Sequence, residues 1–245
     1  MKIQGMLVGA AMASAGLNVA APAADLSTGP FYKAPPAVID ASSPWMIRVR
    51  ALGVLPEASG SSVNVANQPG LSSPSSGLSI GNSVVPELDI SYFFTRNIAA
   101  EVILGVTPHS ITGTGTLANI DVGHVWLLPP TLMLQYHFTD FGAFKPYVGV
   151  GLNYTVFFDQ SPGNAANVNG VAITGLSVNN SFGAAAQVGF DYMIDRHWGL
   201  NFDVKKLYLE PGYAAVATAG GVNIAVNGTA NINPWLIAGG ITYKF

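Results

Sequence analysis

The sequence of 245 residues contains no cysteine, and only 9% of its residues are charged. Without cysteine no disulfide can hold the fold together, although this absence does not identify a compartment. Soluble domains carry about 25% charged residues, so the low charge is unusual for a protein surrounded by water. Apart from the first residues, no apolar run approaches the roughly 20 residues of a membrane-spanning helix. The net charge of −3 provides no basic surface, which excludes nucleic-acid binding.

The first residues have the features of a secretory signal. Lys2 supplies a positive start, residues 6–15 form a small apolar core, and residues 21–23 resemble a cleavage site. We therefore predict a signal peptide over residues 1–23, in preference to an N-terminal helix of the folded protein. Residues 24–43 form a proline-containing leader with little periodicity.

The chain is nevertheless 49% hydrophobic, and its apolar residues tend to fall at every second position. The C-terminal stretch from Trp235 to Phe245 alternates strictly, which predicts a β-strand. An apolar strand without a polar tail would be a risky exposed edge in a soluble sheet. A lipid-facing strand that closes a transmembrane barrel explains both the apolar face and the missing edge.

Seven further segments alternate in the same way. The eight predicted strands cover residues 45–54, 85–95, 98–106, 132–138, 147–156, 182–192, 198–205 and 235–245. The connections between them are alternately long and short, as in outer-membrane barrels with short periplasmic turns and long extracellular loops. We therefore predict an all-β fold over residues 44–245: an eight-stranded antiparallel transmembrane β-barrel of the bacterial outer membrane, with both chain ends on the periplasmic side. The long stretches are predicted to be loops, and the first of them, residues 56–83, is too polar to bury a core. They are residues 56–83, 107–124, 158–180 and 210–232.

The outward faces distinguish a membrane barrel from a soluble one. A soluble sandwich or a lipocalin-like barrel would have polar outward faces, whereas the outward faces predicted here are apolar. Aromatic side chains also gather at the predicted periplasmic strand ends, where a membrane interface accommodates them. These residues are Trp45, Tyr92, Phe94, Tyr136, Phe138, Tyr192, Trp198, Tyr243 and Phe245.

Charged residues of the predicted strands point into the barrel. Eight strands enclose a space that side chains or one small ligand can fill, which excludes a wide aqueous pore. Isolated buried charges are costly, so these side chains are expected to pair in a structural plug rather than to form an ion path. His137 is expected to join them. The predicted network comprises Arg48, Arg50, Glu87, Asp89, Glu101, Asp191, Asp203, Lys205 and Lys244.

The extracellular half of the predicted lumen is apolar. An apolar pocket above a charged plug would bind a small hydrophobic molecule, although side chains that simply fill the barrel would give the same pattern. The predicted lining consists of Leu52, Val54, Ile103, Met133, Phe157 and Leu236.

Two successive prolines, Pro129 and Pro130, interrupt the pattern beside this lumen. Proline has no amide hydrogen for a ladder, so pairing with a neighbouring strand is expected to break here. Such a break would give an apolar ligand a lateral exit into lipid. The alternative is a strand that simply begins at Thr131.

Several separated motifs are similar to the outer-membrane protein W (OmpW) family. They are Thr107-Pro108, the stretch LPPTL at 128–132, KPYVGVGLNY at 145–154 and GAAAQVGFDY at 183–192. The resemblance spans residues 44–245. It implies an eight-stranded outer-membrane barrel with a hydrophobic lumen that moves small hydrophobic compounds, and some members of the family serve as bacteriocin receptors.

The sequence leaves three functions to compare. The first is transport of small hydrophobic molecules through the upper lumen, and the second is an interaction protein whose extracellular loops bind host surfaces, phage or toxins. The third is an enzyme with His109, His124 or Ser110, but no nucleophile, base and acid are fixed together, so no catalytic residue is predicted. The sequence also lacks metal-ligand spacing and a phosphate-binding loop, and no cofactor is predicted. The expected partners are membrane lipid, small hydrophobic solutes and, through the strand ending at Phe245, the outer-membrane assembly machinery.

Overall fold

A computed structural model describes residues 43–163, 165–167 and 169–245. The predicted signal peptide and the leader up to residue 42 lie outside the described residues. The described part consists of strands and one short 3-10 helix, η1 (Pro69–Leu71). Within those ranges, no helix has the length and apolar character needed to cross a membrane.

Eight strands close into a barrel, which confirms the predicted fold class. Each strand pairs with its two neighbours in an antiparallel ladder, and the pairing of β15 with β1 and of β9 with β11 leaves no open edge in the ring. The ring runs in the order β1 (Trp45–Leu55), β4 (Ser83–Phe93), β5 (Ile98–Gly105), β8 (Thr131–His137), β9 (Phe144–Pro162), β11 (Ser181–Met193), β12 (Trp198–Tyr208) and β15 (Trp235–Lys244).

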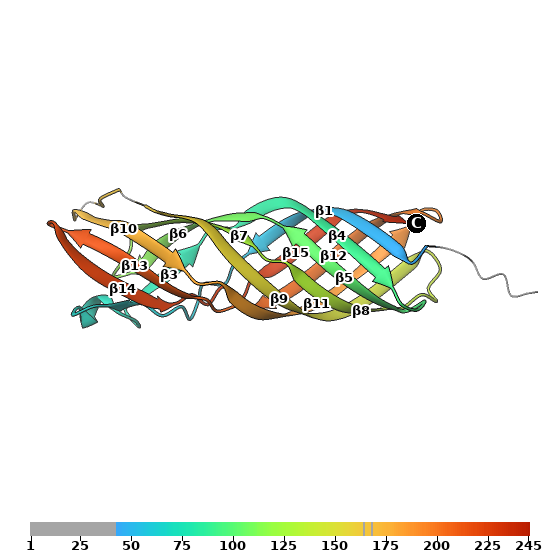
Figure 1. Ribbon diagram of the computed structural model, residues 1–245, viewed down its shortest axis with the longest axis horizontal. Coiled ribbons are helices and arrows are strands. Elements are labelled where there is room, and N and C mark those ends of the chain that lie inside the picture. Colours follow the sequence, from blue (N-terminus) through green and yellow to red (C-terminus); the bar gives the residue numbers. More distant parts are fainter. Residues whose placement is uncertain (1–42, 164, 168) are drawn as a thin grey trace, which may run out of the picture. The chain divides into compact units, whose positions relative to one another are not determined.

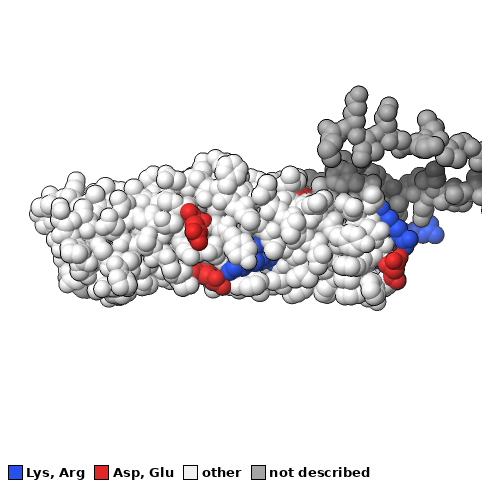
Figure 2. Space-filling view, turned by 90° about the horizontal axis from the view of Figure 1, so that it is seen from below, with Lys and Arg blue, Asp and Glu red and all other residues white. Residues whose placement is uncertain are grey.

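Alternation in the sequence becomes alternation between the two sides of the barrel wall. In β1, Arg48 and Arg50 are buried inside, whereas Val49 between them is 58% exposed on the outside. The same side-to-side pattern places most large exposed hydrophobic residues on the outer surface. Figure 2 shows that this surface is largely uncharged, with charged side chains gathered near the middle and at one end of the face in view.

The two ends of the barrel differ. At the end that carries the C-terminus in Figure 1, which we call the lower end, short connections join β4 to β5, β8 to β9 and β11 to β12. At the opposite, upper end, the connections are long. Strands β10, β13 and β14 lie there in Figure 1.

The long connections lie at the upper end as predicted, but the prediction that they contain no strands is wrong. Most residues of the second, third and fourth connections form strands, and so do short parts of the first. These strands are β2 (Asn64–Val65), β3 (Ser76–Ile80), β6 (Thr107–Gly115), β7 (Asp121–Leu128), β10 (Val171–Val178), β13 (Gly212–Ala219) and β14 (Val222–Thr229). The hydrophobic contrast between their two faces is small, since Ala214 points outward while Ala215 is buried. Periodicity of hydrophobicity therefore gives little signal.

The upper strands form two sheets around an apolar core. One sheet continues the barrel wall in the order β9, β7, β6 and β3, and the other has the order β10, β13, β14 and β2. Val63 and Val65 are only 3% and 5% exposed in this core. The prediction that residues 56–83 bury no core is therefore wrong. The 19-residue strand β9 belongs to both the lower barrel and the upper sheet.

Aromatic side chains mark two levels on the outer surface. At the lower end, the rings of Trp45 and Tyr92 meet edge to face at 4.9 Å, and Tyr136 and Phe138 do so at 5.0 Å. A second group toward the upper end was not expected from the sequence; its members Tyr154, Phe182, Tyr208 and Trp235 are all exposed. Two aromatic levels that flank an apolar band are the pattern of a barrel crossing a bilayer.

Candidate functional site

The lower half of the lumen is filled by ion pairs, the first of which centres on Arg48. Its guanidinium contacts the Asp191 carboxylate twice, with Nε–Oδ1 at 3.0 Å and Nη2–Oδ2 at 2.7 Å. Nη1 also pairs with Glu101 and donates to the Ser91 hydroxyl at 3.1 Å. These partners come from β4, β5 and β11, so a single side chain of β1 ties together strands on different sides of the ring.

A second group of ion pairs centres on Arg50. Its Nη2 atom lies 2.7 Å from Glu87 and 2.6 Å from Asp89, and its Nη1 atom lies 3.7 Å from Asp203. Lys205 pairs with Asp203 at 2.6 Å and with Glu87 at 3.3 Å. All of these side chains are almost fully buried.

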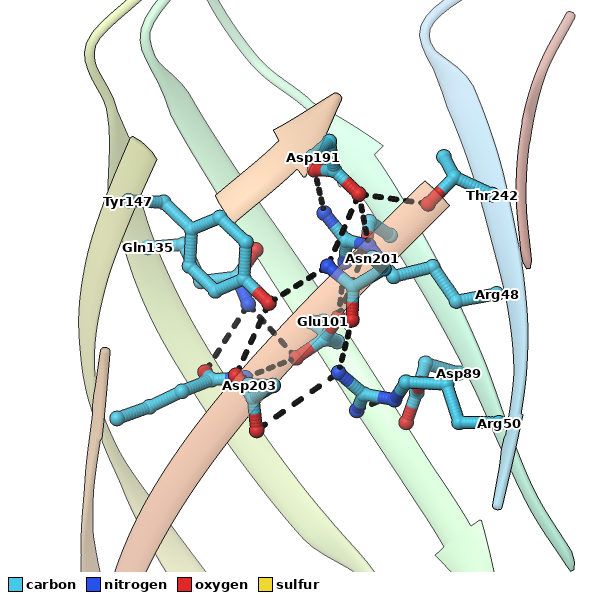
Figure 3. Close-up of polar contacts among 12 residues, drawn as sticks. Arg48, Arg50, Asp89, Glu101, Gln135, Tyr147, Asp191, Asn201, Asp203 and Thr242 are labelled. Atoms are coloured by element: carbon cyan, nitrogen blue, oxygen red, sulfur yellow. Dashed lines mark hydrogen bonds and ion pairs between the residues drawn. The ribbon is translucent and has the colours of Figure 1, made fainter. Parts of the chain in front are cut away.

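Neutral polar side chains join the two groups of ion pairs, as Figure 3 shows. Gln187 donates one amide to both Glu101 and Asp203, at 3.1 and 2.8 Å, and the Tyr147 hydroxyl donates to Asp203 at 2.9 Å. Asn201 donates to the Asp191 carboxylate at 3.0 Å. We call this arrangement the ionic floor. It consists of Arg48, Arg50, Glu87, Asp89, Glu101, Asp191, Asp203 and Lys205 with these neutral partners.

Two residues expected in the network lie at its margin. His137 is 2% exposed, and its Nε2 atom lies 2.9 Å from the Gln135 side-chain oxygen. Gln135 in turn donates to Glu101 at 2.7 Å. Lys244 lies at the lower end, with its ammonium 5.0 Å from the centre of the Phe93 ring.

Above the ionic floor, the lumen holds a small cavity of about 40 Å³. Four residues of the predicted lining, Leu52, Val54, Ile103 and Leu236, contribute to its wall, and Glu87 and Lys205 of the ionic floor also border it. Met133 is fully buried in the same apolar cluster. We call this space the inner cavity.

Two further cavities lie above the inner cavity. A middle cavity of about 30 Å³ includes Phe157, the sixth residue of the predicted lining, and shares His109, Leu127 and Ile232 with the inner cavity. An outer cavity of about 370 Å³ shares Leu78, Val122 and Tyr213 with the middle cavity. The shared residues make the three cavities neighbours in one apolar series. An apolar cavity of about 150 Å³ holds a benzene-sized molecule, so only the outer cavity has room for a ligand without movement of side chains.

His109 lies in the wall between the inner and middle cavities. Its Nδ1 atom lies 2.7 Å from the Gly81 carbonyl oxygen, which can only accept, so Nδ1 carries the proton. The ring belongs to β6, outside the eight barrel strands, and burial lowers its pKa below the usual 6.5. The neutral ring therefore presents Nε2 as an acceptor. Nearby, burial raises the pKa of Tyr213 to about 12, and its hydroxyl donates to the Ser62 carbonyl at 2.9 Å.

The barrel wall beside the inner cavity is incomplete at Pro129 and Pro130. The ladder between β5 and β8 ends at Ile103 opposite Thr131, and the ladder between β6 and β7 begins at Thr107 opposite Leu127. No backbone pair between the described residues joins 104–106 to 128–130. On the other side, the Tyr154 amide donates to the Pro130 carbonyl at 3.1 Å, so contact with β9 is kept.

The residues considered for catalysis are divided between the two sides of the wall. Ser110 and His124 face each other across β6 and β7 on the exposed surface, while His109 points into the lumen. Over the described ranges, no group of three or more His, Asp or Glu side chains is arranged to hold a metal ion.

Sequence reasoning missed part of the cavity wall. Thr107 and His109 lay in a stretch predicted to be a loop, and Ile232 lay at the end of the last such stretch. Leu127 lay between a predicted loop and the next predicted strand and was assigned to neither. The alternation of Thr107, His109 and Ile111 with exposed Pro108 and Ser110 was the available signal. This alternation was not recognised because two of the three inward residues, Thr107 and His109, are polar.

Comparisons with known proteins agree with this architecture. The family model described as OmpW family matches residues 42–245. An uncharacterized outer-membrane protein, y4mB of Sinorhizobium fredii, is 51% identical over 96% of this chain and 95% of its own length. Outer membrane protein W of Vibrio cholerae is 42% identical over 69% of this chain and 76% of its own. The dibenzothiophene metabolism operon protein PahQ of Pseudomonas aeruginosa is 29% identical over 69% of this chain and 74% of its own.

Solved structures show the same fold. The crystal structure of the outer membrane protein OprG from Pseudomonas aeruginosa matches with a TM-score of 0.73 and 25% identity, covering 83% of this chain and 97% of that one. The outer membrane protein AlkL, solved in lipid bilayers, matches with a TM-score of 0.60 and 28% identity, covering 83% and 90%. The lower end, with its short turns, is therefore periplasmic and the upper end extracellular. Since the family model and these relatives agree over the whole barrel, the chain belongs to the OmpW family and is a β-barrel protein of the outer membrane.

Proposed function

We propose that this protein passes small hydrophobic molecules from the cell exterior into the outer membrane through its upper lumen. The observation that carries the proposal is the series of three neighbouring apolar cavities that ends on the ionic floor. A molecule bound in this series is separated from the periplasm by buried ion pairs, so a continuous path down the barrel axis is disfavoured.

The gap in the wall at Pro129 and Pro130 supplies the exit in this proposal. Pro129 and Thr131 line the inner cavity, and so does Gly105 on the opposite side of the gap. Leaving through the gap would move an apolar molecule directly into the hydrocarbon of the bilayer, where it is favourably solvated. The small volumes of the inner and middle cavities mean that side chains must move during passage.

The name of the relative PahQ supports the substrate class. Its operon concerns the metabolism of dibenzothiophene, an apolar aromatic compound. The apolar lining of the cavities in this chain fits solutes of that chemistry.

Assembly of the barrel through its C-terminal strand remains a prediction. In the structure the Phe245 amide donates to the Trp45 carbonyl at 3.1 Å.

An uptake experiment tests the proposal. Leu52→Arg places a charge in the inner cavity and is expected to abolish protein-dependent uptake of dibenzothiophene by cells. Ser110→Arg, which adds the same charge on the exposed face of β6, is the matched control and should transport normally. Normal uptake by a correctly folded Leu52→Arg protein would exclude the lumen as the route.

Surface recognition by the extracellular end is the alternative function. Deletion of residues 59–76, which would test an adhesive loop, also removes Val63 and Val65 from the upper core. Single substitutions on the outward faces of the upper strands are therefore the cleaner test of binding to cells, phage or toxins.

A further inference from the structure

Two polar groups that face the upper lumen, on His109 and Thr107, have no hydrogen-bond partner in the described part of the chain. His109 and Thr107 are only 4% and 3% exposed, and both lie on the inward face of β6, two residues apart. Among the described residues, neither the His109 Nε2 atom nor the Thr107 hydroxyl forms a hydrogen bond, although His109 Nδ1 does. Neither atom belongs to the fully buried, unpaired side-chain atoms of the described residues, so both reach the free space of the cavities that they line. The polar atoms of interior residues are nearly always hydrogen-bonded, so two cavity-facing groups on one strand that lack a protein partner need an explanation.

Both groups face the proposed route. Thr107 lines the inner cavity, and His109 lines the inner and middle cavities. In the middle cavity the remaining lining is aliphatic or aromatic apart from Tyr213, whose hydroxyl is already bonded to Ser62. The charged residues of the inner cavity, Glu87 and Lys205, are paired with each other. The Thr131 hydroxyl, which also lines the inner cavity, donates to the Pro129 carbonyl at 3.0 Å. In the inner and middle cavities, Thr107 and His109 are therefore the groups left to bind a polar atom of a solute.

Their chemistry is complementary to a hydroxyl group. The bond from Nδ1 to the Gly81 carbonyl fixes the proton on that nitrogen, which leaves Nε2 as an acceptor. The threonine hydroxyl both donates and accepts. A neutral hydroxyl on an apolar body could donate to His109 and accept from Thr107, whereas an ether of the same size offers no donor. A carboxylate would find no cation here that is not already paired.

We infer that Thr107 and His109 form a recognition site for a single hydroxyl group, so that the preferred solutes are apolar alcohols and phenols rather than plain hydrocarbons. The inference rests on the proposed function, because it names the chemistry of the solute that the same lumen would bind. It explains why the inner and middle cavities keep two polar side chains that have no protein partner. A site that bound only the apolar body of a solute would bind it as well with valine and leucine at these positions, without the cost of burying polar groups.

A pair of matched solutes tests the inference. Binding of 2-naphthol and of 2-methoxynaphthalene to the full-length barrel in lipid nanodiscs is measured by competition with an apolar dye. In the wild-type protein 2-naphthol should bind about threefold to tenfold more tightly relative to its ether, the range of one net hydrogen bond. Thr107→Val, which keeps the shape of the side chain, and His109→Phe should reduce this ratio toward one. Leu127→Val alters the apolar wall of the same two cavities and should leave the ratio unchanged.

A local readout separates the outcomes. If the inference holds, 2-naphthol shifts the ¹⁵N resonance of His109 Nε2 and the ether does not. The inference would be overturned by equal binding of both solutes to the wild-type protein, or by an Nε2 resonance that 2-naphthol does not shift. Either result would mean that the two groups bind only water, while the proposed apolar route would be unaffected. If neither solute displaces the dye, the proposed function itself fails.

Discussion

Arg48 and Asp191 form a two-pronged ion pair across the inside of the barrel, with N–O distances of 3.0 and 2.7 Å. The two residues are 143 positions apart in the sequence and belong to β1 and β11. Both are essentially inaccessible to solvent. The pair therefore fixes two parts of the wall that are not neighbours in the ring.

Arg48→Met is expected to destabilise the barrel by about 3–5 kcal/mol, because it leaves the carboxylates of Asp191 and Glu101 buried without their cation. Urea unfolding in lipid vesicles measures the loss. Arg96→Met is the matched control: Arg96 pairs with Asp140 at 3.1 Å, but the side chains are 73% and 83% exposed. Its removal should cost at most about 1 kcal/mol. Equal losses in the two variants would contradict a special role for the ionic floor.

Gly105→Leu is expected to reduce uptake of dibenzothiophene by obstructing the gap beside Pro129. A Cβ atom at Gly105 would meet only the Pro86 carbonyl oxygen at 3.6 Å, an ordinary contact, so the backbone tolerates a side chain at this position. Gly53→Leu provides the control, because a Cβ there meets only the Ile237 carbonyl oxygen, also at 3.6 Å, on the outward side of β1. Uptake by cells with the Gly105→Leu protein should fall to the level of cells that lack the protein, whereas uptake with the Gly53→Leu protein should be unchanged. Unchanged uptake through the Gly105→Leu barrel would argue against lateral exit.

Ala217→Phe should weaken binding of an apolar dye by about tenfold, because the ring occupies the outer cavity and removes buried apolar contacts worth about 1.5 kcal/mol. Ala217 lines that cavity and is 8% exposed. On the same strand Ala214 points outward, so Ala214→Phe adds the same ring without filling the cavity. Dye titration of the two variants in nanodiscs compares them. Equally strong binding by both would place the dye elsewhere.

The His109 ring is expected to remain mostly neutral at pH 6.5, where a free imidazole is half protonated, because burial lowers its pKa. The pKa is depressed in the folded protein, so the stability contributed by the neutral ring is present above pH 6.5 and is lost as the pH falls through the lower folded value. A ¹⁵N NMR titration of the imidazole follows this change. A ring that is half protonated at pH 6.5 would show that solvent reaches it freely.

The lower barrel was predictable from the sequence because its two faces differ sharply in chemistry. A strand with Arg48 and Arg50 on one face and Ile47 and Val49 on the other must turn its charged face to the lumen and its apolar face to the lipid. The upper sheets could not be predicted in the same way. Their inward residues, such as Thr107, Ala215 and Ala217, hardly differ in polarity from their outward neighbours. Their pairing depends on partners distant in sequence, for example Val65 opposite Val226.

Within the candidate site too, residues of strongly alternating strands were predicted and residues of weakly alternating segments were not. Leu52, Val54, Ile103 and Leu236 belong to strands with clear alternation, so their inward direction followed from parity. His109 is a polar residue in a weakly patterned segment, and its position above the inner cavity depends on the register of β6 with β7. The volume of each cavity also depends on side-chain packing, which no periodicity encodes.

The 19-residue strand β9 has a further consequence. Since this one strand pairs with β8 in the barrel and with β7 in the upper sheet, the extracellular sheet is a direct extension of the barrel wall. In the proposed route, a hydrophobic solute would therefore enter well above the bilayer surface and be shielded from water by the upper sheets until it reached the membrane.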